Sequence, residues 1–131
     1  MYEVLIPVDD DEERARAQAA AVADLPGRDE IVAHVFHVFT DNPSGASVGQ
    51  HGGARRARDS LEDAGVEVEL HEDGGGNPGG LIVETADDLD VDAICVGARK
   101  RSPAGKALLG STSQDVILSS DRPVIVTGKS K

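Results

Sequence analysis

Short apolar runs alternate with charged, helix-forming stretches along the whole chain. Branched aliphatic residues dominate four of these runs, which predicts buried strands; they are residues 4–8, 31–39, 93–96 and 123–126. A fifth segment, 66–70, alternates apolar and acidic residues and predicts a half-exposed strand at a sheet edge. Capping residues and apolar spacing predict helices between Asp11 and Pro26 and over 54–64, 78–89 and 111–119.

This order predicts an α/β fold with an open parallel five-stranded sheet that is covered by helices, and the length of 131 residues predicts one domain over residues 1–131. In such sheets, ligands bind beyond the carboxyl ends of the strands, where the strand order reverses. Asp9 follows the first strand and Gly97 follows the fourth. If those strands are neighbours, both residues face one crevice.

The charge balance narrows the possible partners. A formal net charge of −11 disfavours nonspecific binding to nucleic acid or to a membrane surface. No apolar run approaches the roughly 18 residues of a membrane helix, no signal-peptide pattern opens the chain, and Cys95 is the only cysteine. These features predict a cytoplasmic protein. The acidic, lysine-poor composition suggests a halophilic source, and the alternative is an ordinary solvated acidic surface. Unfolding in low salt and refolding in molar potassium chloride would support the halophilic source.

One segment, 97–114, departs from this acidic background. It holds Arg99, Lys100, Arg101 and Lys106 but no carboxylate, and it ends in glycine and clustered hydroxyl residues. Such a combination favours the binding of a phosphate, because backbone amides at a helix start and nearby cations both attract an anion. Gly110 would let the backbone approach closely, and the amides of Ser111, Thr112 and Ser113 would open the helix. The alternative is a flexible surface loop that ends in an ordinary helix start.

Other motifs are absent or incomplete. Lys100 stands where a Walker A loop needs its first glycine, and Ala107 where it needs the hydroxyl that binds magnesium. His34 and His37 are three apart on a strand and therefore point to opposite faces. His51 and His71 are isolated in the sequence. We therefore predict no catalytic residue, and no metal beyond Mg²⁺ carried on a nucleotide.

The chain resembles the universal stress protein family over nearly its whole length. The resemblance rests on residues 4–9, on His37 and Val38, on 91–97, on Leu108 to Ser111, and on 123–126. It implies a sheet with strand order 3-2-1-4-5 and helices on both faces. It also implies a homodimer through the last strand, which begins at Pro123 and ends at Thr127.

The resemblance also implies a site for ATP or a related adenine nucleotide. In the ATP-binding branch the motif is G-x2-G-x9-G-(S/T), which Gly97, Gly110 and Ser111 match, while Lys100 replaces the second glycine. By position, four residues would border the base and ribose, and seven would hold the phosphates. The first group is Pro7, Val8, Asp9 and Val38; the second is Gly97, Arg99, Lys100, Gly110, Ser111, Thr112 and Ser113.

Three functions remain open from the sequence. The first is a nucleotide-dependent stress-response regulator with at most slow ATP hydrolysis. The second is an interaction module without nucleotide, whose basic loop binds an anion or an acidic partner. The third is a slow ATPase or phosphotransfer enzyme, whose turnover would depend on Asp9.

Overall fold

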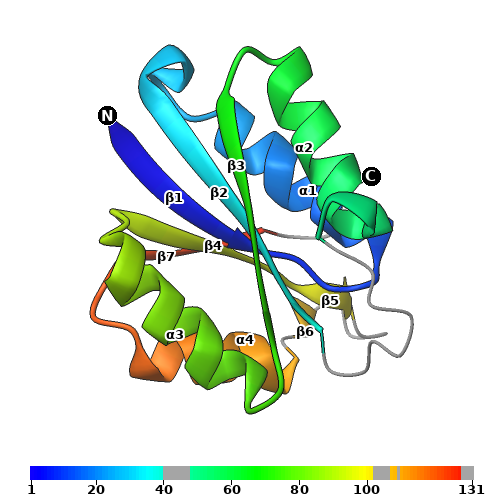
Figure 1. Cartoon of the computed structure of the whole chain (residues 1–131), viewed down its shortest axis with the longest axis vertical. Coiled ribbons are helices and arrows are strands. Elements are labelled where there is room, and N and C mark those ends of the chain that lie inside the picture. The colour runs from blue at the N-terminus through cyan, green and yellow to red at the C-terminus, as the bar shows by residue number, and fades with distance from the viewer. Residues whose placement is uncertain (40–47, 102–106, 109, 128–131) are drawn as a thin grey trace.

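The computed structural model describes residues 1–39, 48–101, 107–108 and 110–127 (Figure 1). Its main sheet is parallel and has five strands in the order β3-β2-β1-β4-β7, which confirms the predicted order 3-2-1-4-5. The strands are β1 (Tyr2–Pro7), β2 (Ile31–Phe39), β3 (Glu67–Gly74), β4 (Ala93–Gly97) and β7 (Val124–Thr127). β3 is an edge strand, as its alternating sequence predicts.

Helices cover both faces of this sheet, as Figure 1 shows. α1 (Glu12–Ala23) and α2 (Gly52–Asp63) lie on one face, and α3 (Pro78–Leu89) and α4 (Ser111–Ser119) lie on the other. Each face has its own apolar core. Val4 and Ile6 of β1 belong to the core under α1 and α2, whereas Leu5 belongs to the core under α3 and α4. The alternation of side chains along a strand produces this division.

Local sequence explains where several helices begin and end. The Asp11 carboxylate accepts a hydrogen bond from the Arg14 amide, at 3.0 Å, and so caps α1 as predicted. Gly65, with φ +84°, follows α2 in the left-handed conformation that favours glycine. Asn77 occupies the N-cap position of α3, but its side chain makes no capping hydrogen bond.

The structure also corrects the sequence-based boundaries. Where a loop was expected after β4, β5 (Arg99–Arg101) and β6 (Ala107–Leu108) form a short antiparallel pair. β3 continues to Gly74, four residues past its predicted end, because it pairs with β2 along that whole length. α2 begins at Gly52 rather than Ala54, and its cap is the His51 ring, which accepts a hydrogen bond from the Ala54 amide.

Two further 3-10 turns complete the described elements: η1 (Arg28–Glu30) and η2 (Val48–Gln50). The second lies just before α2, and residues 40–47, which precede it, fall outside the described residues.

The two central strands separate at their carboxyl ends. β1 pairs with β4 only at Val4–Ala93 and Leu5–Ile94, although each strand continues further beside its other neighbour. Gln18 of α1, which is 1% exposed, reaches into the opening. Its Nε2 donates hydrogen bonds to the Pro7 carbonyl at 2.7 Å and the Cys95 carbonyl at 3.0 Å. One side chain therefore joins two strands whose own ladder has ended.

We expect Gln18→Leu to lower the free energy of unfolding by about 1–3 kcal/mol, because both carbonyls lose a donor in a buried place. Urea denaturation would measure this loss. Arg16→Leu is the matched control, since Arg16 lies on the exposed side of the same helix; its effect should stay within about 0.5 kcal/mol. Equal stability of Gln18→Leu and the wild type would contradict the prediction.

Candidate nucleotide site

A cavity of about 220 Å³ opens where β1 and β4 separate. Eight of the eleven residues that the sequence analysis proposed for the site line this cavity. These are Pro7, Val8, Asp9, Val38, Gly97, Gly110, Thr112 and Ser113. The prediction that Asp9 and Gly97 face one crevice is therefore confirmed by the structure.

One part of the cavity wall is apolar. Its side chains come from β2, α3, β4 and α4, and they continue the core under α3 and α4; they are Phe36, Val38, Ile82, Val96 and Val116. The other part is polar and combines the end of β1 with the starts of α1 and α4. A cavity with one apolar end and a few polar groups at the other suits a flat ring that carries polar substituents.

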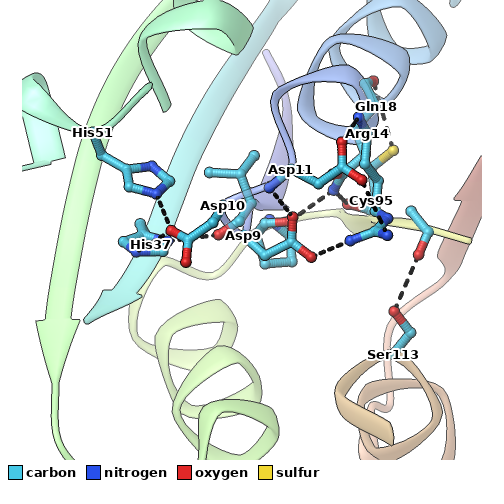
Figure 2. A network of polar contacts seen from close by, with 12 residues as sticks. Asp9, Asp10, Asp11, Arg14, Gln18, His37, His51, Cys95 and Ser113 are labelled. Atoms are coloured by element: carbon cyan, nitrogen blue, oxygen red, sulfur yellow. Dashed lines mark hydrogen bonds and ion pairs between the residues drawn. The ribbon is translucent and has the colours of Figure 1, made fainter. Parts of the chain in front are cut away.

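Asp9 and Arg14 dominate the polar end, as Figure 2 shows. The Asp9 carboxylate accepts one hydrogen bond from the Asp11 amide, at 3.0 Å, and another from Arg14 Nη1. Arg14 Nη2 also lies 3.4 Å from Asp11 Oδ2. The Arg14 side chain is 20% exposed, against 56% for Asp9. This guanidinium is a cation at the cavity that the sequence analysis missed.

Gly97 has a steric role in this arrangement. A Cβ built on Gly97 would lie 2.5 Å from Arg14 Cγ and 3.3 Å from Gln18 Cδ. Glycine at this position therefore leaves room for the aliphatic part of Arg14. It is not needed for a left-handed backbone conformation. A possible signal for Arg14 existed in the sequence: α1 starts directly after β1, so its first turns must lie beside the same crevice as Asp9.

The start of α4 forms the opposite wall. Gly110 is its N-cap, in an extended conformation with φ −71° and ψ 164°, and glycine has no side chain with which to cap the helix. Ser113 Oγ donates a hydrogen bond to the Gly97 carbonyl, at 3.3 Å, which holds α4 against the end of β4. Thr112 and Ser113 line the cavity, whereas Ser111 is exposed and does not.

The predicted cations of the segment 97–114 are only partly described. Arg99, Lys100 and Arg101 form β5, so their backbone follows directly from the end of β4. Lys106 lies outside the described residues.

A buried histidine closes the side of the cavity next to β2. His37 Nδ1 lies 2.8 Å from the Val8 carbonyl and therefore donates its proton there. The ring stacks on His51 with centroids 3.6 Å apart, and His51 Nε2 lies 2.8 Å from Asp10 Oδ1. Burial lowers the pKa of His37, so the ring is neutral at neutral pH. His34 contacts a different set of residues, which agrees with the prediction that the two rings face opposite ways.

Cys95 lies behind the cavity and takes no part in it. Burial raises the pKa of its thiol to about 12, so it remains protonated and unreactive. Cys95 belongs to the apolar core under α1 and α2.

An open parallel sheet with helices on both faces and a cavity at its point of reversal defines a class of α/β ligand-binding proteins. The universal stress protein family pattern matches residues 1–128. The chain belongs to this family.

Known proteins agree with this assignment. A "Universal stress protein" of Mycolicibacterium smegmatis is 34% identical over 65 residues, a match that spans half of this chain and half of that protein. A universal stress protein structure from Archaeoglobus fulgidus has TM-score 0.71 and 29% identity over 97% of this chain and 98% of that one. Another from the same organism, in complex with dAMP, has TM-score 0.70 and 25% identity over 97% of this chain and 98% of that one.

Among the described residues, no helix has the length and apolar character needed to cross a membrane.

The lowered pKa of His37 predicts a pH-dependent stability. The unfolded chain binds a proton on this ring near its ordinary pKa of 6.5, whereas the folded chain resists it. The stabilisation is therefore complete above that value and decreases as the pH falls below it. We expect unfolding free energies at about pH 7.5 and about pH 5.5 to differ less for His37→Gln than for the wild type. An equal difference in both proteins would contradict this.

Proposed function

We propose that this chain binds an adenine nucleotide at the carboxyl ends of β1 and β4 and acts as a nucleotide-dependent regulator in the stress response. The observation that carries the proposal is the cavity itself, which combines an apolar wall with an uncapped helix start at the point where the strand order reverses. The dAMP complex of a related universal stress protein supports the choice of an adenine nucleotide.

The chemistry of the wall suggests an orientation for the ligand. Adenine would lie against Val38, Ile82 and the neighbouring apolar side chains, where its ring is removed from water. The phosphates would lie at the start of α4, whose first amides have no intrahelical partner and carry the positive end of the helix dipole. The cavity volume of about 220 Å³ is below the roughly 300–1,000 Å³ of pockets that enclose a drug-sized ligand. Part of the nucleotide would therefore remain outside, beside β5.

Arg14 would change partners when the nucleotide binds. Without ligand, its guanidinium pairs with Asp9. A terminal phosphate carries about −1.5 to −2 charges at pH 7, more than a carboxylate, and it can accept both guanidinium hydrogen bonds. Transfer of Arg14 to a phosphate would free the Asp9 carboxylate to accept hydrogen bonds from ribose hydroxyls. This single exchange of partners would place Arg14 on the phosphate and Asp9 on the ribose.

Cations beyond Arg14 would come from β5. Lys100 replaces a motif glycine, and a lysine ammonium there could pair with the outer phosphates of ATP. Mg²⁺ would enter only on those phosphates, because the Walker A hydroxyl is absent. We expect any ATP hydrolysis to be slow, and a measurable turnover that Asp9→Ala abolishes would instead indicate that this lining carboxylate acts as a general base.

We expect Thr112→Ala and Gly110→Val to weaken AMP and ATP binding, the first by about 2–10-fold through one lost hydrogen bond and the second by more. The valine side chain would occupy the space that a phosphate needs beside the first amides of α4. Ser119→Ala, at the other end of α4, is the matched control and should bind normally. Isothermal titration calorimetry would measure all four proteins.

The same experiment separates the alternative functions. If neither nucleotide binds but inorganic phosphate does, the chain is an anion-binding interaction module. Normal nucleotide binding by both Thr112→Ala and Gly110→Val would refute the proposed site.

We also propose that the protein forms a homodimer through β7. This strand is at the edge of the sheet, so one side of its backbone has no strand partner in the described structure. Val126, on the same strand, is an apolar residue that is 45% exposed. Exposed apolar edge strands are normally paired or protected.

Val126→Lys should therefore shift the protein from dimer to monomer, because it places a charge against its own copy in a two-fold contact. Light scattering coupled to size-exclusion chromatography would measure the mass. Glu84→Lys, on the exposed side of α3, makes the same addition of a lysine elsewhere and should leave the dimer intact. A monomeric wild type would contradict this proposal without affecting the nucleotide site.

A further inference from the structure

A second polar cluster lies on the sheet away from the cavity. It consists of Glu3 on β1, His34 on β2, and Glu69 and His71 on β3, none of which lines the cavity. In the register of the sheet, His34 is opposite Leu5 on one side and Glu69 on the other. Side chains at every second position share a face, so all four residues project from the face that carries α3 and α4.

The contacts within the cluster determine where the protons are. His34 Nε2 lies 2.8 Å from Glu3 Oε1. An ionised carboxylate only accepts, so this nitrogen carries the proton of the neutral His34 ring. The lone pair is then on Nδ1, which lies 2.9 Å from His71 Nε2. The His34 side chain is 4% exposed and that of His71 is 25% exposed. A buried lone pair therefore faces a second imidazole that solvent can reach.

This arrangement is typical of a metal-binding histidine. Such a ring usually donates its other N–H to a carboxylate, which fixes its orientation and raises its basicity. Glu3 has this relation to His34. Ligand atoms of His34, Glu69 and His71 lie within 4.8 Å of one another. His71 Nε2 donates the hydrogen bond to His34 Nδ1 in the metal-free chain, so an ion that binds between these two nitrogens would replace that proton, which the His71 ring can carry on Nδ1 instead.

The distances are close to those of a bound ion. Two nitrogens that bind one tetrahedral zinc at about 2.0–2.1 Å are about 3.3–3.4 Å apart. His34 Nδ1 and His71 Nε2, at 2.9 Å, would have to separate by about 0.5 Å. Glu69 Oε1, now 3.9 Å from His71 Nε2, would have to approach by a similar distance. The Glu69 side chain is 53% exposed and can make that movement.

We propose that His34 Nδ1, His71 Nε2 and the Glu69 carboxylate bind one divalent ion of the zinc class, with water in the fourth position and Glu3 as a positioning residue. Two imidazoles and one carboxylate suit zinc and its neighbours in the first transition series. Mg²⁺ and Ca²⁺ prefer sites made entirely of oxygen ligands. The ion would connect β2 to the edge strand β3.

The other cluster of histidines is a poorer candidate. His51 Nδ1 accepts a hydrogen bond from the Ala54 amide, so the proton of the neutral ring is on Nε2 and points at Asp10. A neutral His51 ring that bound a metal through Nε2 would carry its proton on Nδ1, where the proton would break the hydrogen bond that caps α2. The His37 and His51 rings are also stacked, with only 17° between their planes. Their in-plane lone pairs are therefore nearly parallel and do not converge on one ion.

The test is a Zn²⁺ titration of the full chain without a polyhistidine tag and without nucleotide, in competition with a chromogenic chelator. We expect one Zn²⁺ per chain, with affinity lowered at least tenfold in His71→Ala and Glu69→Gln, and 10–100-fold in Glu3→Gln as for other positioning carboxylates. Co²⁺ should give the visible absorption of a four-coordinate ion, lost in His71→Ala. Mg²⁺ should not compete.

The control is His51→Asn, which keeps a capping side chain on α2 and removes an imidazole from the other cluster. It should bind Zn²⁺ as the wild type does. His71 and Glu69 are altered in place of the buried His34 because their exposure lets the variants fold, which circular dichroism would verify. Unchanged Zn²⁺ affinity in His71→Ala, or its loss in His51→Asn, would overturn the proposal. AMP binding should be the same in His71→Ala and the wild type, so failure here is distinguishable from failure of the nucleotide site.

Discussion

The separation of β1 from β4 is the constraint on which the candidate site depends. The helices that follow these two strands, α1 and α4, leave for opposite faces of the sheet, so neither covers the carboxyl ends between them. Beyond Leu5 and Ile94 the ladder stops, and an empty gap there would leave carbonyl groups without donors. Gln18 satisfies two of them with a single amide group. The gap can therefore stay open at its outer end, where the cavity lies.

The negative charge of the chain works against the binding of an anion at that cavity. A chain with net charge −11 repels anions at long range, and Asp9 and Asp10 both line the opening. Salt screens this general field over about 8–10 Å, whereas direct contacts with Arg14 and the amides of α4 act at much shorter range. Pairing of Arg14 with Asp9 also keeps an unliganded guanidinium from standing alone in a partly buried place. The local arrangement can thus favour a phosphate despite the acidic surface.

The sequence was a good guide to features that depend on nearby residues. The cap at Asp11, the left-handed turn at Gly65 and the alternation of β3 each follow from a few neighbouring residues, and the alternating order of strands and helices led to the sheet. Contacts between distant segments were harder to foresee. The aliphatic part of Arg14 packs against Gly97, which lies 83 positions later in the chain, and a side chain at position 97 would collide with it. His71 looked isolated because only the pairing of β2 with β3 brings it to His34.

β2 is the element that the two candidate sites share. Its carboxyl half supplies Phe36 and Val38 to the cavity, while His34, two residues earlier on the same face, belongs to the polar cluster. The cluster contains the buried imidazole of His34. A buried polar group costs free energy unless its hydrogen-bonding atoms are satisfied, whereas an aliphatic side chain at the same place would need no polar partner. An ion at His34 and a nucleotide beside Val38 would both restrict the same strand. Any effect of one on the affinity for the other must then be reciprocal, because linkage between two binding equilibria is symmetric.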